Sequence, residues 1–187
     1  MNIIKTAIPE VLVIEPDFHG DYRGYFFESF RKDIFEKHAG EVNFVQDNQS
    51  KSNYGVLRGL HFQKPPFSQA KLVQCLQGEV IDIAVDLRIG SPTYGDYVSI
   101  RLSDANHRQL FIPRGFAHGF VVVSETAVFS YKCDNYYNPD ADGGVVWNDP
   151  QINIDWFLSP DDLQLSDKDK KLPLFNEVNC FNYKNLH

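Results

Sequence analysis

Cysteine is scarce in this chain, and long hydrophobic runs are missing. The three cysteines are Cys75, Cys133 and Cys180, and no two of them have CxxC spacing. An odd number without that spacing argues against a disulfide framework and against a structural zinc site. No stretch approaches the ~18 consecutive apolar residues of a membrane-spanning helix, and no N-terminal segment combines basic residues with an apolar run. We therefore expect a cytoplasmic protein without a membrane segment.

Positive charge is in the minority. Lys and Arg number 18 against 25 Asp and Glu, so the net charge is −7 at pH 7. This balance argues against a general nucleic-acid-binding protein, whose surface is basic. It still allows an anionic ligand that is held by a few local Arg and Lys side chains. Neither GxGxxG nor GxxxxGKS/T occurs, so no common nucleotide-binding loop is indicated.

Short runs of β-branched and aromatic residues, separated by turn residues, dominate what is present. In the clearest run, 81–87, apolar residues alternate with Asp82 and Asp86, which predicts a strand with one apolar face and one face carrying carboxylates. In the first half of the chain, only residues 31–38 have convincing helical spacing, and short helices could begin at Ser159 and at Ser166. The pattern predicts one all-β domain over residues 1–187, a jelly-roll sandwich or barrel with a few short helices. The expected strands are 11–14, 25–30, 43–50, 56–63, 71–78, 81–87, 97–102 and 127–133, and 111–123 is an apolar run broken by Pro and Gly.

The chain is organised around two of these strands, Val56–Gln63 and Lys71–Gly78, which are joined across a Pro-Pro break. A histidine among apolar neighbours is more often structural, but His61 shares a strand face with small and polar residues, which favours a chemical role. Arg58 falls on the opposite face of the same strand. The two side chains can serve one site only if the strand bulges, and Gly59 is where it could.

Three further side chains are candidates for chemistry. Lys71 is in a position where a lysine is usually a solvated charge, but its alternation partners Val73 and Cys75 look buried, which suits an electrostatic stabiliser. Tyr131 alternates with apolar residues and so points inward, either as a core tyrosine or as a reacting group. His118 lies among small residues that leave room around its ring.

The partner of His61 is open at this point. Asp169 is one candidate, although Ser166-x-x-Asp169 also has the spacing of a helix capping box. Asp82 and Asp86 could face a barrel interior and are its rivals.

Several short motifs follow one another along nearly the whole chain, and their combination and order are specific although each is weak alone. They are Gly20-Asp-x-Arg23-Gly-x-Phe-x-Glu28-Ser-Phe30, Phe44-Val-Gln-Asp-Asn48-x-Ser50, Leu57-Arg-Gly-Leu-His61-Phe-Gln63, Lys71-Leu-Val, Pro113-Arg-Gly-Phe-Ala-His118-Gly-Phe, Tyr131-Lys-x-x-x-Tyr136-Tyr, Asp155-Trp and Leu165-Ser-x-Lys-Asp169. In this arrangement the chain resembles the dTDP-4-dehydrorhamnose 3,5-epimerase family, whose members have a cupin-type jelly roll.

The resemblance implies a role for individual residues. His61 would be the general base, Asp169 would orient it, and Tyr131 would be the acid on the other face of the sugar. Lys71 would steady the enolate oxygen. The nucleotide-sugar substrate would be held by Arg23, Glu28, Gln46, Asn48, Arg58, His118, Asp142 and Lys168. Members are homodimers, and Arg23 and Glu28 would reach the ligand of the neighbouring subunit.

The implied reaction inverts C3 and C5 of a dTDP-4-keto-6-deoxyhexose, from dTDP-4-dehydro-6-deoxy-D-glucose to dTDP-4-dehydro-L-rhamnose. The ketone at C4 acidifies both positions, a histidine can remove a proton near neutral pH, and a fixed ammonium stabilises the charge that collects on O4. No cofactor is expected, and no metal either. Metal-binding cupins use an HxH pair, whereas here His61 is followed two residues later by Gln63.

The chain departs from the family pattern at a few positions, and some alternative functions stay open. His19 stands where Phe is common, Asp142 where Glu is expected and Ala70 where Gly is usual. Instead of a two-carbon epimerase, the chain could be a single-carbon epimerase or a ketoisomerase acting on a related nucleotide sugar. A non-catalytic sugar-binding jelly roll and a metal-dependent cupin are the alternatives of another class. The sequence leaves the nucleotide and the number of inverted carbons open.

Overall fold

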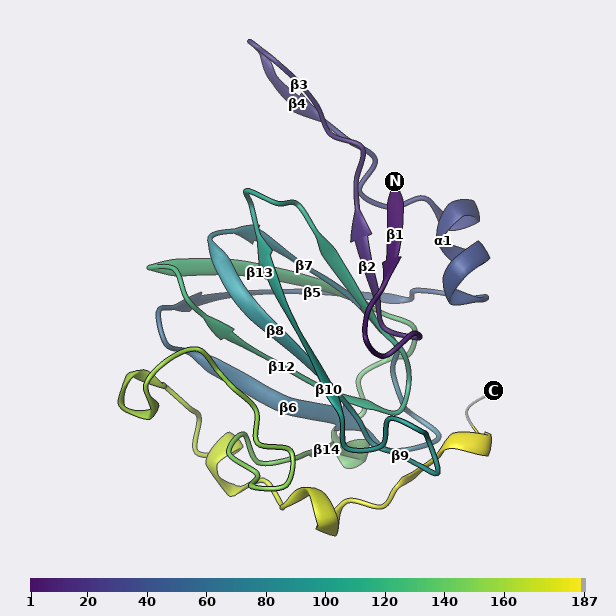
Figure 1. Ribbon diagram of the computed structural model, residues 1–187, viewed down its shortest axis with the longest axis vertical. Helices are drawn as coiled ribbons and strands as arrows, with labels where there is room; N and C mark the ends of the chain where they lie inside the picture. The colour runs from purple at the N-terminus through teal and green to yellow at the C-terminus, as the bar shows by residue number, and fades with distance from the viewer. Residues whose placement is uncertain (186–187) are drawn as a thin grey trace.

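The computed structural model describes residues 1–185, which form two facing antiparallel sheets of six and five strands (Figure 1). The order in the larger sheet is β1-β2-β11-β7-β13-β5, with β1 (Asn2–Lys5), β2 (Leu12–Glu15), β11 (Gln109–Ile112), β7 (Lys71–Gln77), β13 (Thr126–Cys133) and β5 (Gln46–Asn53). The order in the smaller sheet is β10-β8-β12-β6-β14, with β10 (Tyr97–Ser103), β8 (Glu79–Asp86), β12 (Phe116–Val122), β6 (Leu57–Gln63) and β14 (Asp142–Gly144). The predicted all-β jelly-roll class is confirmed.

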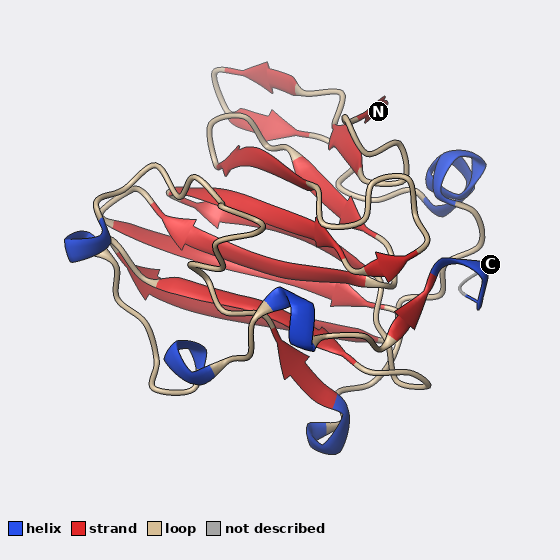
Figure 2. Ribbon diagram, turned by 60° about the horizontal axis from the view of Figure 1, so that its bottom comes forward, coloured by secondary structure: helices blue, strands red, loops and turns tan. Residues whose placement is uncertain are grey.

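The remaining elements are short and lie around the sheets (Figure 2). They are the hairpin strands β3 (His19–Asp21) and β4 (Gly24–Phe26), helix α1 (Lys32–Ala39), the parallel pair β9 (Arg88–Ile89) and β15 (Phe181–Asn182), and the 3-10 helices η1 (Pro139–Ala141), η2 (Pro160–Asp162), η3 (Asp169–Lys171), η4 (Phe175–Glu177) and η5 (Tyr183–Asn185). Within residues 1–185, no helix is long and apolar enough to cross a membrane.

The observed strands differ most from the predicted pattern at three places. The broken run 111–123 forms two strands, β11 and β12, which belong to different sheets. The stretch 25–30 is extended only as far as Phe26, and it pairs with β3 in a separate hairpin instead of joining either sheet. Strand β5 begins three residues later than predicted and continues to Asn53, because its pairing with β13 runs the full length of both strands. The predicted helix is present as α1, and the N–H of Gly40 donates to the carbonyl of Glu36 at its end.

Three groups of buried apolar side chains hold the layers together. The first lies between the two sheets and includes Phe129 from β13 and Phe120 from β12, whose ring centroids are 4.2 Å apart. The second lies on the outer face of the smaller sheet, where Ile83 belongs to the same cluster as Phe175 of the C-terminal segment. The third places Phe35 of α1 against the outer face of the larger sheet. Strand β8 is therefore buried on both faces, and alternation alone marked only one of them as apolar.

The two central strands of the sequence lie in different sheets, β6 in the smaller and β7 in the larger. The loop between them crosses from one layer to the other, so His61 and Lys71 reach the space between the sheets from opposite walls. Strand β6 also contains the predicted bulge. Against β12, His61 is in register with His118, but Arg58 is in register with Phe120, so three steps on β6 match two steps on β12.

The bulge occurs where two glycine backbones come together. Gly59 has φ +119°, and a Cβ atom added to it would lie 2.6 Å from the Cα atom of Gly119 on β12. A side chain at this position would therefore collide with the neighbouring strand. The bulge brings Arg58 to the same cavity as His61, as the sequence analysis required for a shared site.

Candidate active site

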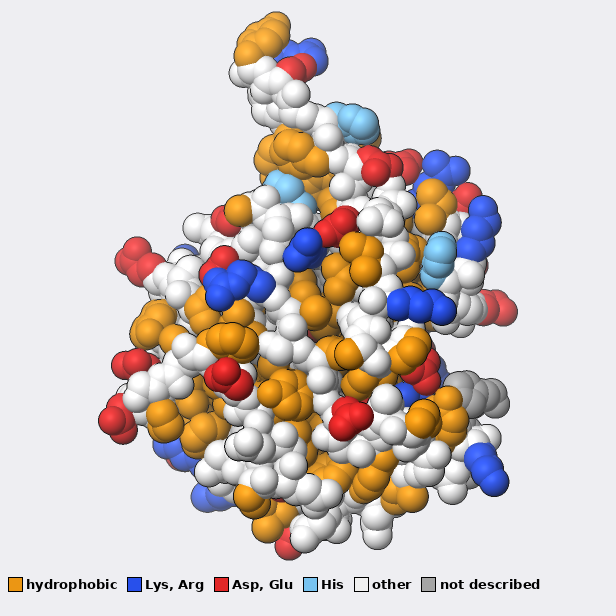
Figure 3. Space-filling model, viewed as in Figure 1, with side chains coloured by type: hydrophobic (Ala, Val, Ile, Leu, Met, Phe, Trp, Pro, Cys, Tyr) orange, Lys and Arg blue, Asp and Glu red, His pale blue; other side chains and the backbone are white. Residues whose placement is uncertain are grey.

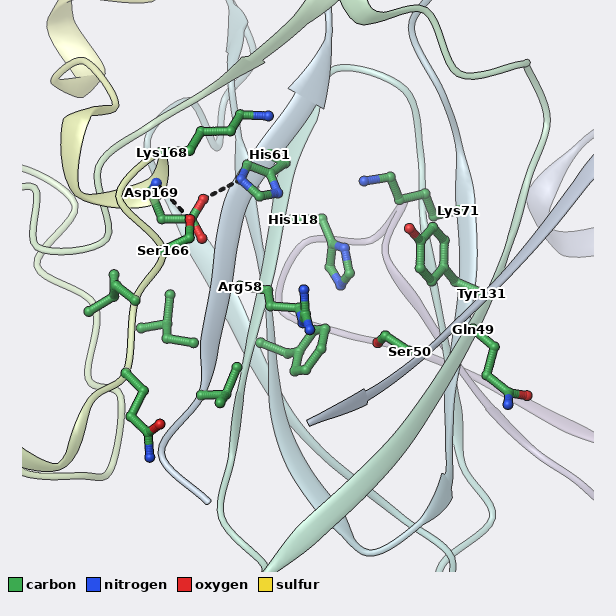
Figure 4. A pocket seen from close by; sticks show the side chains of 15 residues that line it. Gln49, Ser50, Arg58, His61, Lys71, His118, Tyr131, Ser166, Lys168 and Asp169 are labelled. Atoms are coloured by element: carbon green, nitrogen blue, oxygen red, sulfur yellow. Dashed lines mark hydrogen bonds and ion pairs between the residues drawn. The ribbon is translucent and has the colours of Figure 1, made fainter. Parts of the chain in front are cut away.

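A cavity of about 570 Å³ lies between the sheets, and the candidate residues point into it from both walls (Figure 4). A smaller recess of about 270 Å³ adjoins it and shares four of its lining residues, His61, Lys71, Tyr131 and Lys168. Of the residues predicted for the site, the cavity is lined by Arg58, His61, Lys71, His118, Tyr131, Lys168 and Asp169. The recess adds Gln46, Asn48 and Asp142.

His61 and Asp169 form the tightest polar contact of the cavity. Nε2 of His61 lies 2.6 Å from Oδ1 of Asp169, although the two residues are 108 positions apart in the chain. Asp169 is almost completely buried. Burial alone would raise the pKa of Asp169, but the hydrogen bonds from His61 and from Ser166, together with the charge of Lys168, outweigh it and lower the pKa below its usual value. With Asp169 ionised, the His61 proton resides on Nε2, and Nδ1 is left with a free lone pair.

The capping geometry proposed for Asp169 is also present in part. The Oγ atom of Ser166 accepts a hydrogen bond from the backbone N–H of Asp169 at 3.1 Å. The carboxylate of Asp169, however, is directed to His61 and not back to the start of the turn. The serine thus fixes the backbone that presents the carboxylate.

The two rival carboxylates are engaged elsewhere. Oδ2 of Asp82 lies 3.0 Å from Nε2 of His118, on the neighbouring strand β12. The carboxylate of Asp86 accepts hydrogen bonds from Arg88, with Oδ1 at 2.8 Å from Nε, and from Ser91. Both aspartates are fully buried, as Asp169 nearly is, so burial does not explain which carboxylate contacts His61. The placement of the strands does.

Lys71 and Tyr131 face His61 from the larger sheet. Nζ of Lys71 lies 6.0 Å from the centre of the Tyr131 ring. Burial lowers the pKa of Lys71, while Cys133, Asp82 and Asp142 act in the opposite direction. Burial and the neighbouring Cys133 raise the pKa of Tyr131, with the guanidinium of Arg58 opposing them. Tyr131 is thus a protonated hydroxyl at neutral pH, on the wall opposite His61.

The residues predicted to hold the ligand lie around this centre. Nε of Arg58 donates to Oγ of Ser52 at 3.1 Å. Nε2 of Gln46 donates to Oδ1 of Asn48 at 3.0 Å, so this amide pair is ordered on β5. Lys168 forms an ion pair with Asp142, which closes one side of the recess.

Arg23 and Glu28 are the two predicted residues that do not reach the cavity. They belong to the segment 18–28, called the arm below, whose hairpin projects from the body of the protein (Figure 1). Arg23 pairs with Asp21 near its tip at 2.5 Å, and Glu28 lies 3.8 Å from Arg31. The tip carries exposed hydrophobic and charged side chains (Figure 3), among them Tyr22, which is 97% exposed.

Several cavity residues were not anticipated as site residues. Alternation along β5 places Ser50 on the same face as Asn48, so that signal was available. Leu165 and Ser166 could have been inferred from their closeness in sequence to Asp169. Neither Phe120 nor Gln164 carried a chemical signal, and they form apolar and polar parts of the wall. The full set of unanticipated lining residues is Gln49, Ser50, Val56, Leu57, Phe120, Gln164, Leu165 and Ser166.

The cavity contains side chains that can bind metal ions, among them His61, His118 and Asp169. Across residues 1–185, no three His, Cys, Asp or Glu side chains gather closely enough to hold a metal ion. The donors that do meet are pairs, His61 with Asp169 and His118 with Asp82.

Comparisons with known proteins identify the family to which this chain belongs. The family profile described as dTDP-4-dehydrorhamnose 3,5-epimerase matches residues 5–177. The chain is 54% identical over 179 residues to the dTDP-4-dehydrorhamnose 3,5-epimerase of Salmonella typhimurium, covering 95% of this chain and 97% of that one. The chain belongs to the dTDP-4-dehydrorhamnose 3,5-epimerase family. As a member of this epimerase family it is an enzyme, as predicted.

Solved structures support the family assignment at the level of the fold. A dTDP-6-deoxy-D-glucose-3,5-epimerase from Legionella pneumophila, in complex with dTDP-4-keto-L-rhamnose, superposes with a TM-score of 0.93 at 49% identity and covers 97% of this chain and 98% of its own. A 3'-monoepimerase from Streptomyces bikiniensis, in complex with dTDP-quinovose, has a TM-score of 0.87 at 30% identity, covering 96% of this chain and 93% of its own. The fold of this epimerase family therefore includes enzymes named for one inverted carbon and for two.

Proposed function

We propose that this epimerase inverts C3 and C5 of dTDP-4-dehydro-6-deoxy-D-glucose to form dTDP-4-dehydro-L-rhamnose, through an enolate that is formed and reprotonated in the cavity between the sheets. The reaction follows from the family assignment. The observation that carries the proposed mechanism is that His61 and Tyr131 line one cavity from opposite sheets. Epimerisation by deprotonation requires a base on one face of the carbon and a proton donor on the other.

His61 is the proposed base, and Asp169 its orienting partner. The contact of Asp169 with Nε2 directs Nδ1 of His61 away from the carboxylate and toward the cavity (Figure 4). Asp169 also stabilises the imidazolium that forms when the base accepts a proton, because its charge is almost completely buried beside the ring. The pair therefore resembles in function the His–Asp part of other proton-transfer sites.

Lys71 is the proposed stabiliser of the enolate oxygen. Its amino group is held in a half-buried position on β7, where a positive charge interacts more strongly with a developing negative charge than it would in water. Because the charge on O4 grows as the proton leaves, this interaction is stronger in the transition state than in the ground state.

Tyr131 is the proposed acid. Its raised pKa keeps the hydroxyl protonated at the pH where His61 acts as a base. A phenol on the opposite wall can return a proton to the face that His61 does not reach. Arg58 beside it stabilises the phenolate that is left behind.

The nucleotide part of the substrate needs local positive charge on a protein whose net charge is −7. Arg58 and Lys168 line the cavity, and guanidinium groups pair strongly and directionally with phosphate oxygens. Gln46, Asn48 and His118 supply neutral hydrogen-bonding groups to the same space. Asp142 is proposed to act with Lys168, its ion-pair partner.

We propose a homodimer in which the arm of one subunit completes the site of the other. The arm exposes apolar side chains, with Tyr25 at 62% and Phe26 at 68% exposed, and burying them against a second copy would be favourable. Arg23 would then supply a further cation to the substrate diphosphate in the partner's cavity.

Subunit complementation tests the homodimer and the arm together. An Arg23→Ala chain and a His61→Asn chain are each expected to be nearly inactive alone. Co-expression should restore activity, because a mixed dimer contains one site with an intact His61 and an intact Arg23 from its partner. Co-expression of His61→Asn with Lys71→Met is the control, because both changes lie in the same cavity and no mixed dimer has an intact one. Recovery in the control, or no recovery in the test pair, would contradict the exchange of arms.

The reaction itself is tested by proton NMR in D₂O with dTDP-4-dehydro-6-deoxy-D-glucose as substrate. Deuterium should enter at C3 and at C5, with inversion at both. His61→Asn should slow this exchange by about 10²–10⁴-fold, whereas His38→Asn, an exposed histidine on α1, should leave it unchanged. A folded His61→Asn enzyme with normal turnover would remove His61 as the base.

A single-carbon epimerase is the second candidate, because the 3'-monoepimerase of Streptomyces bikiniensis shares the fold. In the same NMR experiment it would introduce deuterium at C3 only. The cytoplasmic location stays a prediction, which cell fractionation would test.

A further inference from the structure

Asp82 is a buried carboxylate that the mechanism above does not use. It lies near the centre of β8, with no exposed surface, and both of its oxygens approach the same ring nitrogen of His118, at 3.0 and 3.2 Å from Nε2. Strand β12 places Phe120 directly opposite Asp82, so His118 is its diagonal neighbour on the same sheet. His118 lines the cavity, and Asp82, which does not line it, holds the ring from the side away from the cavity.

An isolated charge in this position would be costly. Transferring a carboxylate from water to a protein interior is unfavourable unless charged and hydrogen-bonding partners compensate it. Burial raises the pKa of Asp82 above its usual value, although His118 and the ammonium of Lys71 oppose that rise. Both groups line the cavity. Asp82 shares its face of β8 with Val80 and Ala84 of the apolar cluster between the sheets, so it points toward the site and not toward the surface of the protein.

His118 has two ring nitrogens with different surroundings. Nε2 faces Asp82, whereas Nδ1 has no hydrogen-bond partner in the described part of the chain. A carboxylate that accepts from Nε2 holds the ring in the tautomer whose Nδ1 is an acceptor. In Figure 4, His118 lies between His61 on one wall and Lys71 with Tyr131 on the other, where a hydroxyl group of the sugar could donate to it.

We propose that Asp82 is a positioning residue of the epimerisation, which holds the His118 proton on Nε2 and faces the Lys71 side chain from behind the cavity. The proposal deepens the proposed function and rests on it, because it matters only if Lys71 stabilises an enolate. The other ionisable groups that face Lys71 or His118 are His61 on β6, Tyr131 and Cys133 on β13, and Asp142 on β14.

These other groups do not replace Asp82. Burial raises the pKa values of both Tyr131 and Cys133, so neither is an anion at neutral pH. Asp142 is engaged in its ion pair with Lys168. Asp82 is therefore the remaining carboxyl group that acts on Lys71 inside the protein.

The first test reads the tautomer of His118 directly and does not depend on activity. In wild-type protein labelled with ¹⁵N-histidine, the His118 signals are assigned by their loss in His118→Asn. We expect the shifts of a neutral ring protonated at Nε2. A neutral ring protonated at Nδ1 would mean that Asp82 donates to His118, and it would overturn the proposal.

The second test removes the charge and keeps the shape. In Asp82→Asn the amide oxygen can still accept from Nε2, so the tautomer should be retained and only the charge lost. The midpoint of the Lys71 titration, followed by ¹³C NMR of its Cε atom, should fall by at least about 1 pH unit. The pH at which kcat decreases on the alkaline side should shift downward by a similar amount. Asp86→Asn, the matched change on the same face of β8, should lower the melting temperature and leave both midpoints in place.

The outcomes separate the proposal from the proposed function. An unchanged Lys71 midpoint in folded Asp82→Asn would overturn the proposal, as would an equal shift in Asp86→Asn. If wild-type protein failed to epimerise the dTDP-4-keto sugar, the proposed function would fail, although the Lys71 and His118 spectra could still be read. If Asp82→Asn did not fold, the wild-type tautomer measurement would decide.

Discussion

Replacing Gly59 with alanine should damage both the stability of the protein and the geometry of its cavity. Gly59 is the residue at which β6 bulges, and the bulge allows Arg58 and His61 to line the same cavity. An added Cβ atom would lie 2.6 Å from the Cα atom of Gly119 and 2.7 Å from the carbonyl oxygen of His118. Both contacts are with backbone atoms in the interior of the smaller sheet, which cannot rotate away as a side chain would.

The size of the effect follows from two separate costs. The φ value of +119° lies in a region where a non-glycine residue costs about 1–3 kcal/mol. Overpacking against a buried strand costs about 1–3 kcal/mol more. We therefore expect Gly59→Ala to lower the free energy of unfolding by about 2–6 kcal/mol in total. Any backbone shift that relieves the collision moves Arg58 relative to His61, and a displacement of ~1 Å in an active site can cost ~10²-fold in rate.

Gly90→Ala is the matched control. Gly90 also has a positive φ, +88°, but an added Cβ atom would have no neighbour within 4 Å. It should therefore lose only the conformational part, about 1–3 kcal/mol, and keep its turnover. Urea unfolding followed by circular dichroism gives the two free energies, and the epimerisation assay gives the two rates. Equal losses of stability in the two variants, with normal turnover in Gly59→Ala, would refute the collision as the reason for glycine at this bulge.

Three further changes test the proposed roles of the cavity residues. Lys71→Met should lower turnover at least ~10²-fold. Because burial lowers the pKa of Lys71, the wild-type stability should rise with pH between that lowered pKa and the usual value of 10.5, and this rise should be absent from Lys71→Met in urea titrations; the same rise in the variant would contradict this sign. Tyr131→Phe should retain solvent exchange with unchanged configuration while inverted product falls ~10²-fold, measured by NMR, and normal product with a lowered melting temperature would reject the acid role. Arg58→Ala should weaken dTDP binding about 10–100-fold in calorimetry, the loss of one charge-assisted hydrogen bond, and unchanged affinity would remove Arg58 from the ligand site.

Local pattern was sufficient for most of the longer strands and for the direction of many side chains, but the short strands β1, β3, β9, β14 and β15 were not predicted. Alternation on β13 placed Tyr131 inward between two buried residues, as observed. The need for a bulge at Gly59 also followed from alternation, because Arg58 and His61 are an odd number of residues apart and cannot share a face of a regular strand. The pattern was less informative at residues 25–30, because an apolar aromatic run predicts a strand but does not say whether it joins a sheet or leaves the body as an arm.

What the sequence determined by itself was therefore the set of strands, the face on which each candidate side chain lies and the family to which the motifs point. What only the tertiary structure decided was which faces meet. Asp169 had two possible local roles and two rivals, Asp82 and Asp86, and its contact with His61 spans 108 positions. The side-chain period of a strand is a local property of the backbone, whereas the pairing of β6 with β12 and its position opposite β7 depend on burial of apolar surface between distant segments. That burial places His61 and Tyr131 on opposite walls of one cavity.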